Sequence, residues 1–348
     1  MRAKGLLVLL GSVCFILAMA APSSAGPKSI ADMKPTVWRT QAATPAGHVF
    51  TEMFVNFGKG VEKRTGGKLK LKVYPSAGLG YPLTSTISTV RDGLQDVGYL
   101  LGAFCHGECP VIDLMEIPGL IPGDLDLRWK IRQGINSFYE KILPAKYGQY
   151  HLGGAQCGPR ILGTIKKKIV TIDDLKGMKI RSSGANETKI SKLLGIAPVS
   201  ITTPEVYSAL SSGTIDGCWG ADEWYDAAKF YEVLKYAYAS DIDGHTLAMS
   251  VNKKAFDALP PDAQKIVREE GAKVFAWYAE EVKSVISNSR KVCMSKGMEY
   301  TYITKADWKR VVELAKPIVD DNIKEGGSDA KEIITKIQSM VTEWEAKK

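Results

Sequence analysis

Residues 173–184 read DDLKGMKIRSSG, and the way this stretch continues decides the fold. A short apolar run ends at Arg181 and a small polar turn follows, which is typical of the end of a β-strand. A helix-like segment then covers 187–195, and a second strand-like segment covers 197–202. A strand, a helix and a second strand in succession predict a β-α-β unit, so we expect an α/β protein.

The same alternation continues after this unit and also precedes it. A short helix is expected at 203–213, with Thr203 as its N-cap, and TIDGCW at 214–219 reads as the next strand. Two such sets predict two α/β lobes separated by a cleft, with mainly parallel sheets. The earlier set consists of strands at 36–44, 68–75 and 96–104 and of helices at 46–67 and 83–93.

A long helix and further strands follow the second set. From Pro261 onward, the apolar pattern is typical of a helix of more than thirty residues, which is long enough to brace two lobes. Strand-like segments flank it at 246–252 and 297–304, and amphipathic helices end the chain. Because no disordered linker separates the lobes, we expect several strands to cross between them. The predicted lobe I comprises 26–157 with 247–286, and the predicted lobe II comprises 158–246 with 287–348.

The N-terminus has the features of a secretory signal peptide at 1–25. It begins with Arg2 and Lys4, continues as an apolar stretch from Leu6 to Ala21, and ends in small residues. The alternative, a membrane anchor, needs about 20 apolar residues, which is more than this stretch offers. No later segment is apolar enough to span a membrane. We therefore expect a protein that is exported to the periplasm and is not itself embedded in the membrane.

Composition and charge exclude some functions. The chain has 348 residues, of which 45% are hydrophobic and 24% charged, as in an ordinary globular protein of two domains. The formal net charge of +8 falls to +6 without the signal peptide. Lysines and carboxylates are interleaved, so we attribute this excess to solubility. No nucleic-acid-binding motif is present, and we expect no nucleic-acid partner.

Cysteines and motifs give no sign of a metal or of catalysis. Cys105 and Cys109 lie close together in CHGEC, and in an oxidising compartment we expect either a disulfide or two free thiols. Zinc is the weaker alternative, because no second pair of ligands accompanies them. The sequence contains no CxxC, HExxH, GxSxG or phosphate-loop motif. We expect no metal, no cofactor and no enzyme activity.

Two arginines and a tryptophan are the first candidates for a ligand site. Ligands of open α/β sheets bind outside the carboxyl ends of the strands, where Arg181 and Trp219 lie. Arg160 stands at the entry to the second lobe. A guanidinium matches a carboxylate with two parallel hydrogen bonds, and an aromatic wall suits an apolar body. These residues predict a site for a carboxylate between the lobes.

Each candidate also has a purely structural interpretation. Arg181 could be a surface charge paired with the aspartates at 173–174, and Arg160 could form a salt bridge at the hinge. Trp219 could belong to the core, which is common for tryptophan, and Cys218 could be an inert buried thiol.

Six stretches together carry a resemblance that favours the ligand site. They are YPSAGLG (74–80), VRDGLQDVG (90–98), IDDLKGMKIRSSG (172–184), LLGIAPVSITTPEVYSALSSGTIDG (193–217), KFYEVLKYA (229–237) and NKKAFDALPPDAQKIV (252–267). With them, the chain resembles the solute-binding subunit of tripartite ATP-independent periplasmic (TRAP) transporters, the C4-dicarboxylate-binding-protein family. The resemblance implies a two-lobed periplasmic binding protein fold with crossing strands and a long lobe-spanning helix.

The resemblance also implies roles for individual positions. Arg181 matches the arginine that holds the carboxylate of the ligand in most of the family, and Arg160 matches a second arginine found in many members. The other predicted ligand-binding residues are Trp219, Cys218, Gly220, Thr203, Ser183, Tyr99, Leu101, Tyr81 and Gln41.

Several of these positions depart from the sialic-acid binders of the family. Thr203 stands where those proteins have an aromatic ring, Leu101 lies near an acidic contact, and Tyr81 replaces an acidic residue. Trp219 stands in a segment where several members place polar ligand contacts. A polyhydroxylated sugar acid would leave hydroxyl groups unpaired in such a pocket, which costs free energy. We therefore expect a small or aromatic monocarboxylate.

The resemblance implies a function as well. An open form captures the carboxylate, the lobes close on it, and the closed form delivers it to a TRAP membrane permease that is driven by an ion gradient. One alternative is a sensor that presents its closed form to a membrane signalling partner. A less favoured alternative is an exported enzyme acting on a carboxylate, for which Glu205, Asp216 and Cys218 are the candidate catalytic residues.

Overall fold

The computed structural model describes residues 26–201 and 203–348, so the predicted signal peptide lies outside the described residues. The strands are β1 (Thr36–Gln41), β2 (Leu69–Tyr74), β3 (Val97–Leu101), β4 (Gln149–Thr164), β5 (Lys179–Ser182), β6 (Ala197–Ser200), β7 (Gly217–Gly220), β8 (Tyr236–Asn252) and β9 (Glu299–Tyr302). The α-helices are α1 (Val49–Arg64), α2 (Thr86–Arg91), α3 (Gly102–Cys105), α4 (Leu125–Lys146), α5 (Ala185–Leu193), α6 (Val206–Ser211), α7 (Asp222–Ala227), α8 (Lys253–Asp257), α9 (Pro261–Ser295) and α10 (Lys305–Glu345). Short 3₁₀ turns are η1 (Ile30–Asp32), η2 (Leu83–Ser85), η3 (Leu114–Glu116), η4 (Ile172–Leu175), η5 (Thr203–Glu205) and η6 (Phe230–Glu232).

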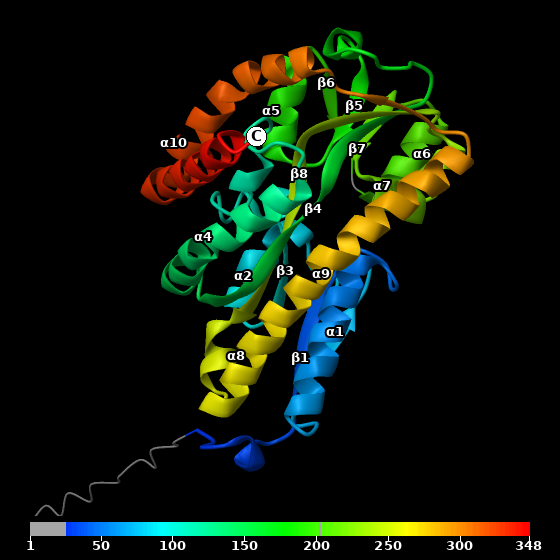
Figure 1. The fold of residues 1–348 in the computed structure, drawn as a ribbon. Helices are drawn as coiled ribbons and strands as arrows, with labels where there is room; N and C mark the ends of the chain where they lie inside the picture. The colour runs from blue at the N-terminus through cyan, green and yellow to red at the C-terminus, as the bar shows by residue number, and fades with distance from the viewer. Residues whose placement is uncertain (1–25, 202) are drawn as a thin grey trace, which may run out of the picture.

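Two long strands run through the middle of the molecule (Figure 1). Strand β4 has 16 residues and β8 has 17, and the two pair antiparallel along most of their length. Strand β3 pairs with one end of β8, and β7 pairs with the other end of β4. The two long strands therefore pass from one α/β half of the molecule to the other, which confirms the expectation of crossing strands.

The expectation of mainly parallel sheets is wrong for the large sheet. Its strand order is β3-β8-β4-β7-β5-β6, with β9 beside β8. Strand β5 is parallel to β6 and β7, and β9 is parallel to β8, but the pairs β3–β8, β4–β8 and β4–β7 are antiparallel. The β-α-β rule describes consecutive local units. Strand β4 carries the chain from one half to the other and β8 carries it back, so these two strands run in opposite directions.

Each half has its own hydrophobic core, and a third core lies beside the sheet that joins them. One core contains Phe54 of α1 and Phe275 of α9, together with buried residues of β1, β2 and β3. A second core contains Tyr225 of α7, and it is formed largely by residues of β7, β8 and the surrounding short helices. The third core is supplied by α4, α5 and α10, with Ile135 and Ile333 among its fully buried members.

Two long helices brace the two halves against each other. Helix α9 has 35 residues and packs first on α1 and then on α7, so it spans both halves, as predicted (Figure 1). Helix α10 has 41 residues and bends at Gly327, where φ is 63° and ψ is −144°. Its first arm lies against α5 and its second arm against α4. The exact division of residues between the lobes stays a prediction.

The segment after β6 differs from the prediction in one detail. Thr203 opens the 3₁₀ turn η5, and α6 begins only at Val206, with Glu205 as its N-cap. Thr203 is therefore not the N-cap of an α-helix. Among residues 26–201 and 203–348, no helix combines the length and the apolar character that crossing a membrane requires.

Candidate functional site

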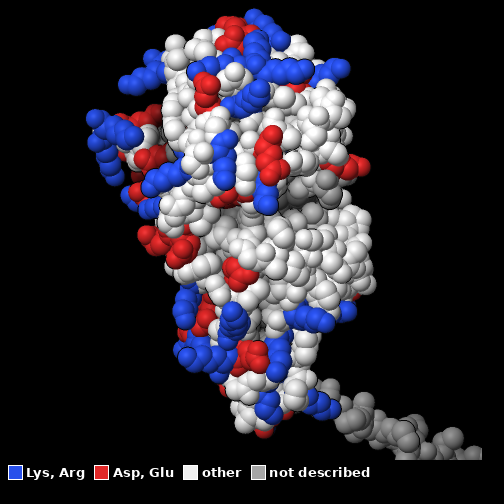
Figure 2. Space-filling view, turned by 90° about the vertical axis from the view of Figure 1, so that its right-hand side faces the viewer, with Lys and Arg blue, Asp and Glu red and all other residues white. Residues whose placement is uncertain are grey.

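A cavity of about 570 Å³ lies between the two halves of the molecule. The carboxyl ends of β3, β5, β6 and β7 reach it, since the last residue of each strand is part of its lining. Figure 2 shows a hollow across the middle of the molecule, with mostly uncharged surface below it. The crevice therefore lies where ligands of α/β sheets are expected to bind. The aromatic members of its lining are Phe50, Tyr99, Phe104, Trp219 and Trp224, together with the imidazoles of His48 and His245.

Arg181 is a buried cation in the wall of this cavity. Its side chain is on β5 and is only 4% exposed. Nε donates a hydrogen bond to the carbonyl oxygen of Ile201 (3.2 Å), and Nη2 donates to Oγ1 of Thr203 (3.4 Å). Cζ lies 5.4 Å from the centre of the Trp224 ring. Burial lowers the pKa of Arg181 from its usual value, and among the described residues no carboxylate forms an ion pair with it.

The alternative of a surface salt bridge for Arg181 is wrong. Asp173 forms ion pairs with Arg310 and Lys176 instead, with nitrogen–oxygen distances of 2.9 Å in both pairs. Asp174 accepts hydrogen bonds from the backbone of its own turn, at Val170 and Thr171. Both aspartates are therefore engaged elsewhere, and the charge of Arg181 is available to a ligand.

Arg160 is also buried, but it does not belong to the described lining of the cavity. Its guanidinium forms ion pairs with Asp243 and Glu187, and it lies 3.9 Å from Oε2 of Glu116. Nη1 is also 3.0 Å from Nε2 of His245, which does line the cavity. Burial alone would lower the pKa of Arg160, but the carboxylates outweigh it and raise the pKa. Arg160 thus forms buried ion pairs, as the structural interpretation of this residue expects. Its direct contact with a ligand stays a prediction.

The other predicted residues divide into two groups. Cys218 is buried beside the hydroxyl of Tyr225 and lies outside the described lining. Gln41 and Tyr81 also lie outside it, and Nε2 of Gln41 donates a hydrogen bond to the carbonyl oxygen of Tyr81 (2.8 Å). The predicted residues that do line the cavity are Arg181, Trp219, Gly220, Thr203, Ser183, Tyr99 and Leu101.

Several lining residues were not singled out from the sequence as ligand contacts, among them one tryptophan, one phenylalanine and one histidine. Trp224 lies on the short helix α7, five residues after Trp219, and covers one face of Arg181. Phe50 lies in the predicted helix at 46–67, and its position at the start of α1 brings it to the cavity. His48 caps α1 by accepting a hydrogen bond from the backbone of Phe50, and burial lowers the pKa of His48 to about 4. The imidazole of His48 is therefore neutral at neutral pH.

Glu223 is an acidic group in the lining. It is 5% exposed, and its Oε2 has no hydrogen-bond partner among the described residues. Burial raises the pKa of Glu223 to about 7. The adjacent Asp222 has a different environment, because it pairs with Arg290 (2.7 Å) and accepts a hydrogen bond from the hydroxyl of Tyr300 (2.7 Å).

The five cysteines of the described part of the chain are buried free thiols. Cys105 and Cys109 are not bridged, so the free-thiol alternative describes them. Burial raises the pKa of the Cys109 and Cys218 thiols to about 12 each. A thiol with such a pKa is a poor nucleophile at neutral pH. No group of residues suited to hold a metal ion occurs in the described part of the chain.

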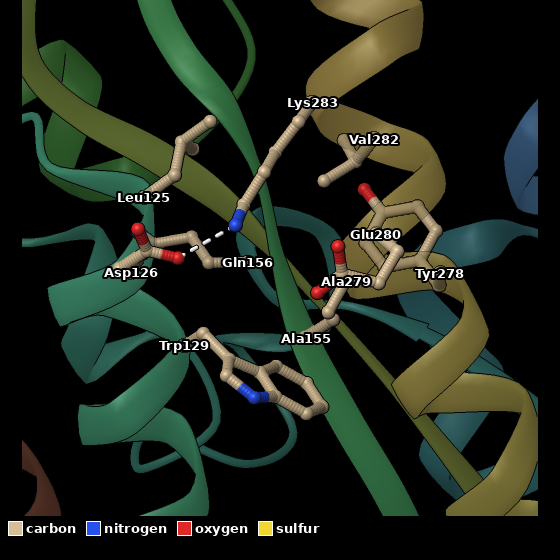
Figure 3. A pocket seen from close by; sticks show the side chains of 10 residues that line it. All are labelled: Leu125, Asp126, Trp129, Ala155, Gln156, Tyr278, Ala279, Glu280, Val282 and Lys283. Carbon is tan, nitrogen blue, oxygen red and sulfur yellow. Dashed lines mark hydrogen bonds and ion pairs between the residues drawn. The ribbon is translucent and has the colours of Figure 1, made fainter.

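A smaller hollow lies between α4 and α9 and next to β4. Figure 3 shows it, with the ion pair between Lys283 and Asp126 at one side and Trp129 at the other. The Nζ–Oδ1 distance of that pair is 2.7 Å. The hollow has a volume of about 30 Å³, which is space for a water molecule or two and not for an organic ligand.

A ligand-sized cavity at the strand ends between two α/β halves defines the class of two-lobed binding proteins. Residues 40–325 match the family model of bacterial extracellular solute-binding protein family 7, DctP. The chain belongs to this family, and its TRAP-type solute-binding fold is confirmed.

Relatives of known structure or annotation support the same assignment. The 2,3-diketo-L-gulonate-binding periplasmic protein YiaO of Escherichia coli is 26% identical over 287 residues, covering 81% of this chain and 86% of the relative. DctP6, a Bordetella pertussis extracytoplasmic solute receptor binding pyroglutamic acid, is 27% identical with a TM-score of 0.81, covering 87% of this chain and 100% of that one. A TRAP periplasmic solute-binding protein from Desulfovibrio salexigens with bound orotic acid shares the fold at 23% identity and a TM-score of 0.80, covering 88% and 99%.

Proposed function

We propose that the protein captures a small organic acid in the cavity between its lobes, with the carboxylate of the ligand held by Arg181. The single observation that carries the proposal is a guanidinium that is 4% exposed, lines a cavity and has no ion pair among the described residues. A buried charge without a partner is costly, so an anion that enters the cavity gains more there than it would in water.

The size and lining of the cavity support a monocarboxylate with an apolar or aromatic body. A volume of about 570 Å³ is in the range of pockets for small molecules. Three large aromatic side chains in the lining of the cavity offer apolar contacts to a ligand. They are Tyr99, Trp219 and Trp224. The relatives with bound pyroglutamic acid and orotic acid hold cyclic acids of this kind, whereas another relative binds galacturonate.

Delivery to a membrane permease is the second part of the proposal. In the periplasm, a ligand shifts the lobes towards a closed arrangement by as much as it binds that arrangement more tightly than the open one. The closed form then docks on the permease subunits of a TRAP transporter. Membership of a family of solute-binding proteins supports transport over catalysis. Asp216, a candidate catalytic residue, accepts a hydrogen bond from the backbone of Lys179 (2.8 Å) and so has a structural role.

A thermal-shift screen across organic acids, followed by calorimetry of each hit, tests the proposal. We expect at least one monocarboxylate to raise the unfolding temperature and to be recovered chemically unchanged. Stabilisation by neutral sugars and by none of the acids would overturn it. Genes for permease subunits beside the gene of this protein would support transport, and a gene for a membrane kinase in that place would favour a sensor.

A further inference from the structure

Glu223 is the second charged group that can meet a ligand in this cavity. It lies in the first turn of α7, one residue before the Trp224 that covers Arg181. Glu223 is only 5% exposed, and it lines the cavity. A Cβ atom on Gly158 would lie 3.1 Å from Oε2 of Glu223, so this carboxyl group reaches the backbone of β4.

Comparison with the neighbouring carboxylate shows that Glu223, among the described residues, lacks the ion pair that would explain a buried charge. Asp222 has Arg290 and Tyr300 at 2.7 Å each, and these contacts tie α7 to α9 and β9. Glu223 has no ion pair among the described residues, and its Oε2 accepts no hydrogen bond from any of them. Backbone N–H groups of Gly158 and of Glu223 itself lower the pKa of this carboxyl group without offsetting its burial. A buried carboxyl oxygen without a partner, such as Oε2, is expensive to keep and is typical of binding sites that are completed by a ligand.

The chemistry of a carboxyl group restricts what can complete it. Once a ligand carboxylate neutralises Arg181, a second carboxylate near Glu223 would place two like charges in surroundings of low polarity, which is unfavourable. A ligand N–H or O–H group can instead donate a hydrogen bond to the free oxygen. The raised pKa of Glu223, about 7, fits this picture because nothing in the described protein stabilises its ionised form enough to offset burial.

We propose that Glu223 is a specificity-determining residue, which selects monocarboxylates that also carry a hydrogen-bond donor and rejects dicarboxylates. This inference rests on the proposed capture of a carboxylate by Arg181. The proposed role of Glu223 adds a second point of recognition, on α7, to the one that Arg181 provides on β5. The ligand class then narrows to acids that carry a donor, such as lactam, amino or hydroxy acids.

Calorimetry with matched pairs of acids tests the inference. The pairs are pyroglutamate with cyclopentanecarboxylate, and mandelate with phenylacetate, and succinate serves as the dicarboxylate. A further pair consists of the acid that binds most strongly in the thermal-shift screen and an analogue that lacks its hydrogen-bond donor. In the unaltered protein, we expect the donor-bearing member of at least one pair to bind about tenfold or more tightly than its counterpart, because an unpaired buried polar group is penalised by that order of magnitude. Equal affinities in every pair that binds, or tighter binding of succinate, would overturn the inference.

Variants at Glu223 assign the preference to this residue. Glu223→Leu should bring the affinity ratio of each pair close to one, because the acceptor is lost while the volume is kept. Glu223→Gln, which keeps an uncharged acceptor, should improve the binding of succinate relative to the unaltered protein, and it replaces the leucine variant if that one does not fold. Asp222→Asn is the matched control: it should lower stability and leave the ratios unchanged. A preference that survives Glu223→Leu, or that Asp222→Asn removes, would contradict the assignment.

The two proposals fail in different ways. If donor-free acids bind and their donor-bearing counterparts do not, carboxylate capture stands and the role of Glu223 is refuted. If no carboxylate binds, the proposed function is refuted and this inference falls with it.

Discussion

The guanidinium carbon of Arg181 lies 5.4 Å from the centre of the Trp224 ring. A cation over the face of an indole is attracted by the quadrupole of the ring, whose face has a negative electrostatic potential, and the contact also covers one side of the guanidinium plane. The orientation of Arg181 is further fixed by the hydrogen bonds to Ile201 and Thr203. Arg181 is therefore held in place before a ligand arrives, which lowers the entropy cost of binding a carboxylate.

Replacing Trp224 should weaken ligand binding without removing the charge. Trp224→Leu deletes the cation–π contact, which is worth about 0.5–2 kcal/mol, and we expect the dissociation constant to rise between about twofold and thirtyfold. Trp224→Phe keeps an aromatic face and should lose less. Calorimetry with one carboxylate hit measures both variants, and equal affinities for all three proteins would show that the ring does not position Arg181.

Gly220 has a structural reason to lack a side chain. A Cβ atom there would lie 2.4 Å from Cε1 of Tyr225 and 2.8 Å from Cε3 of Trp224, so Gly220→Ala must displace both rings. We expect a loss of about 1–3 kcal/mol of unfolding free energy together with weaker ligand binding. Gly107→Ala is the control, because nothing lies within 4 Å of a Cβ at Gly107. Urea denaturation measures the unfolding free energy of the two variants, and equal values for both would contradict the packing argument.

The two buried arginines should respond differently to the same substitution. Arg160→Met leaves Asp243 and Glu187 buried without their cation, and breaking such a pair costs about 3–5 kcal/mol. Arg181→Met removes a buried cation that has no ion pair among the described residues, so stability should stay the same or rise. Denaturant unfolding compares the two. An Arg160→Met protein of unaltered stability that has lost ligand binding would instead identify Arg160 as a direct contact.

His106 predicts a dependence of stability on pH. Its Nδ1 is 2.9 Å from Asp113 and its Nε2 is 2.8 Å from Glu325 of α10, and these carboxylates, chiefly Asp113, raise the pKa of His106 to about 9 despite burial. An unfolded histidine has a pKa of about 6.5, so this stabilisation is lost as the pH rises from that value through about 9. It also declines at acidic pH, because burial raises the pKa of Asp113 to about 6 and a protonated Asp113 no longer pairs with the imidazolium.

The variant His106→Gln isolates this contribution. We expect it to be less stable than the unaltered protein by about 1–2 kcal/mol at pH 6, allowing for screening at the partly exposed Glu325, and nearly equal to it at pH 10. Urea denaturation at both pH values provides the comparison. A difference that is the same at pH 6 and pH 10 would show that protonation of His106 does not stabilise the fold.

Local patterns predicted the elements that carry their own signals. The period of two in β2 and the helical period of α1 reappear almost residue for residue, and the polar turn after Arg181 is indeed the end of β5. Strand β4 gave no such signal, because nearly all of its residues are buried and its glycines break any alternation. Without β4, the antiparallel pairing with β8 could not be foreseen.

The candidate site was foreseen at Arg181 and at part of its walls, and missed where α7 contributes to it. Arg181 stands out in sequence as a charge directly after an apolar run. Trp224 and Glu223 lie on α7, which has six residues and is too short to show a helical period. Their approach to Arg181 and to β4 depends on how α7 packs after β7, which is a property of the tertiary fold. Arg160 was chosen for its place at the entry to the second lobe and then by resemblance, and only the structure shows the three carboxylates around it.

The most direct test of the account is the affinity of the strongest carboxylate hit for the unaltered protein and for Arg181→Met, measured by calorimetry at neutral pH. Losing a buried charged partner costs about 2–5 kcal/mol or more, so we expect the dissociation constant to rise by at least about thirtyfold, with Arg181→Lys in between. An Arg181→Met protein that is folded and binds the acid with nearly unaltered affinity would contradict the central claim that this guanidinium recognises the ligand.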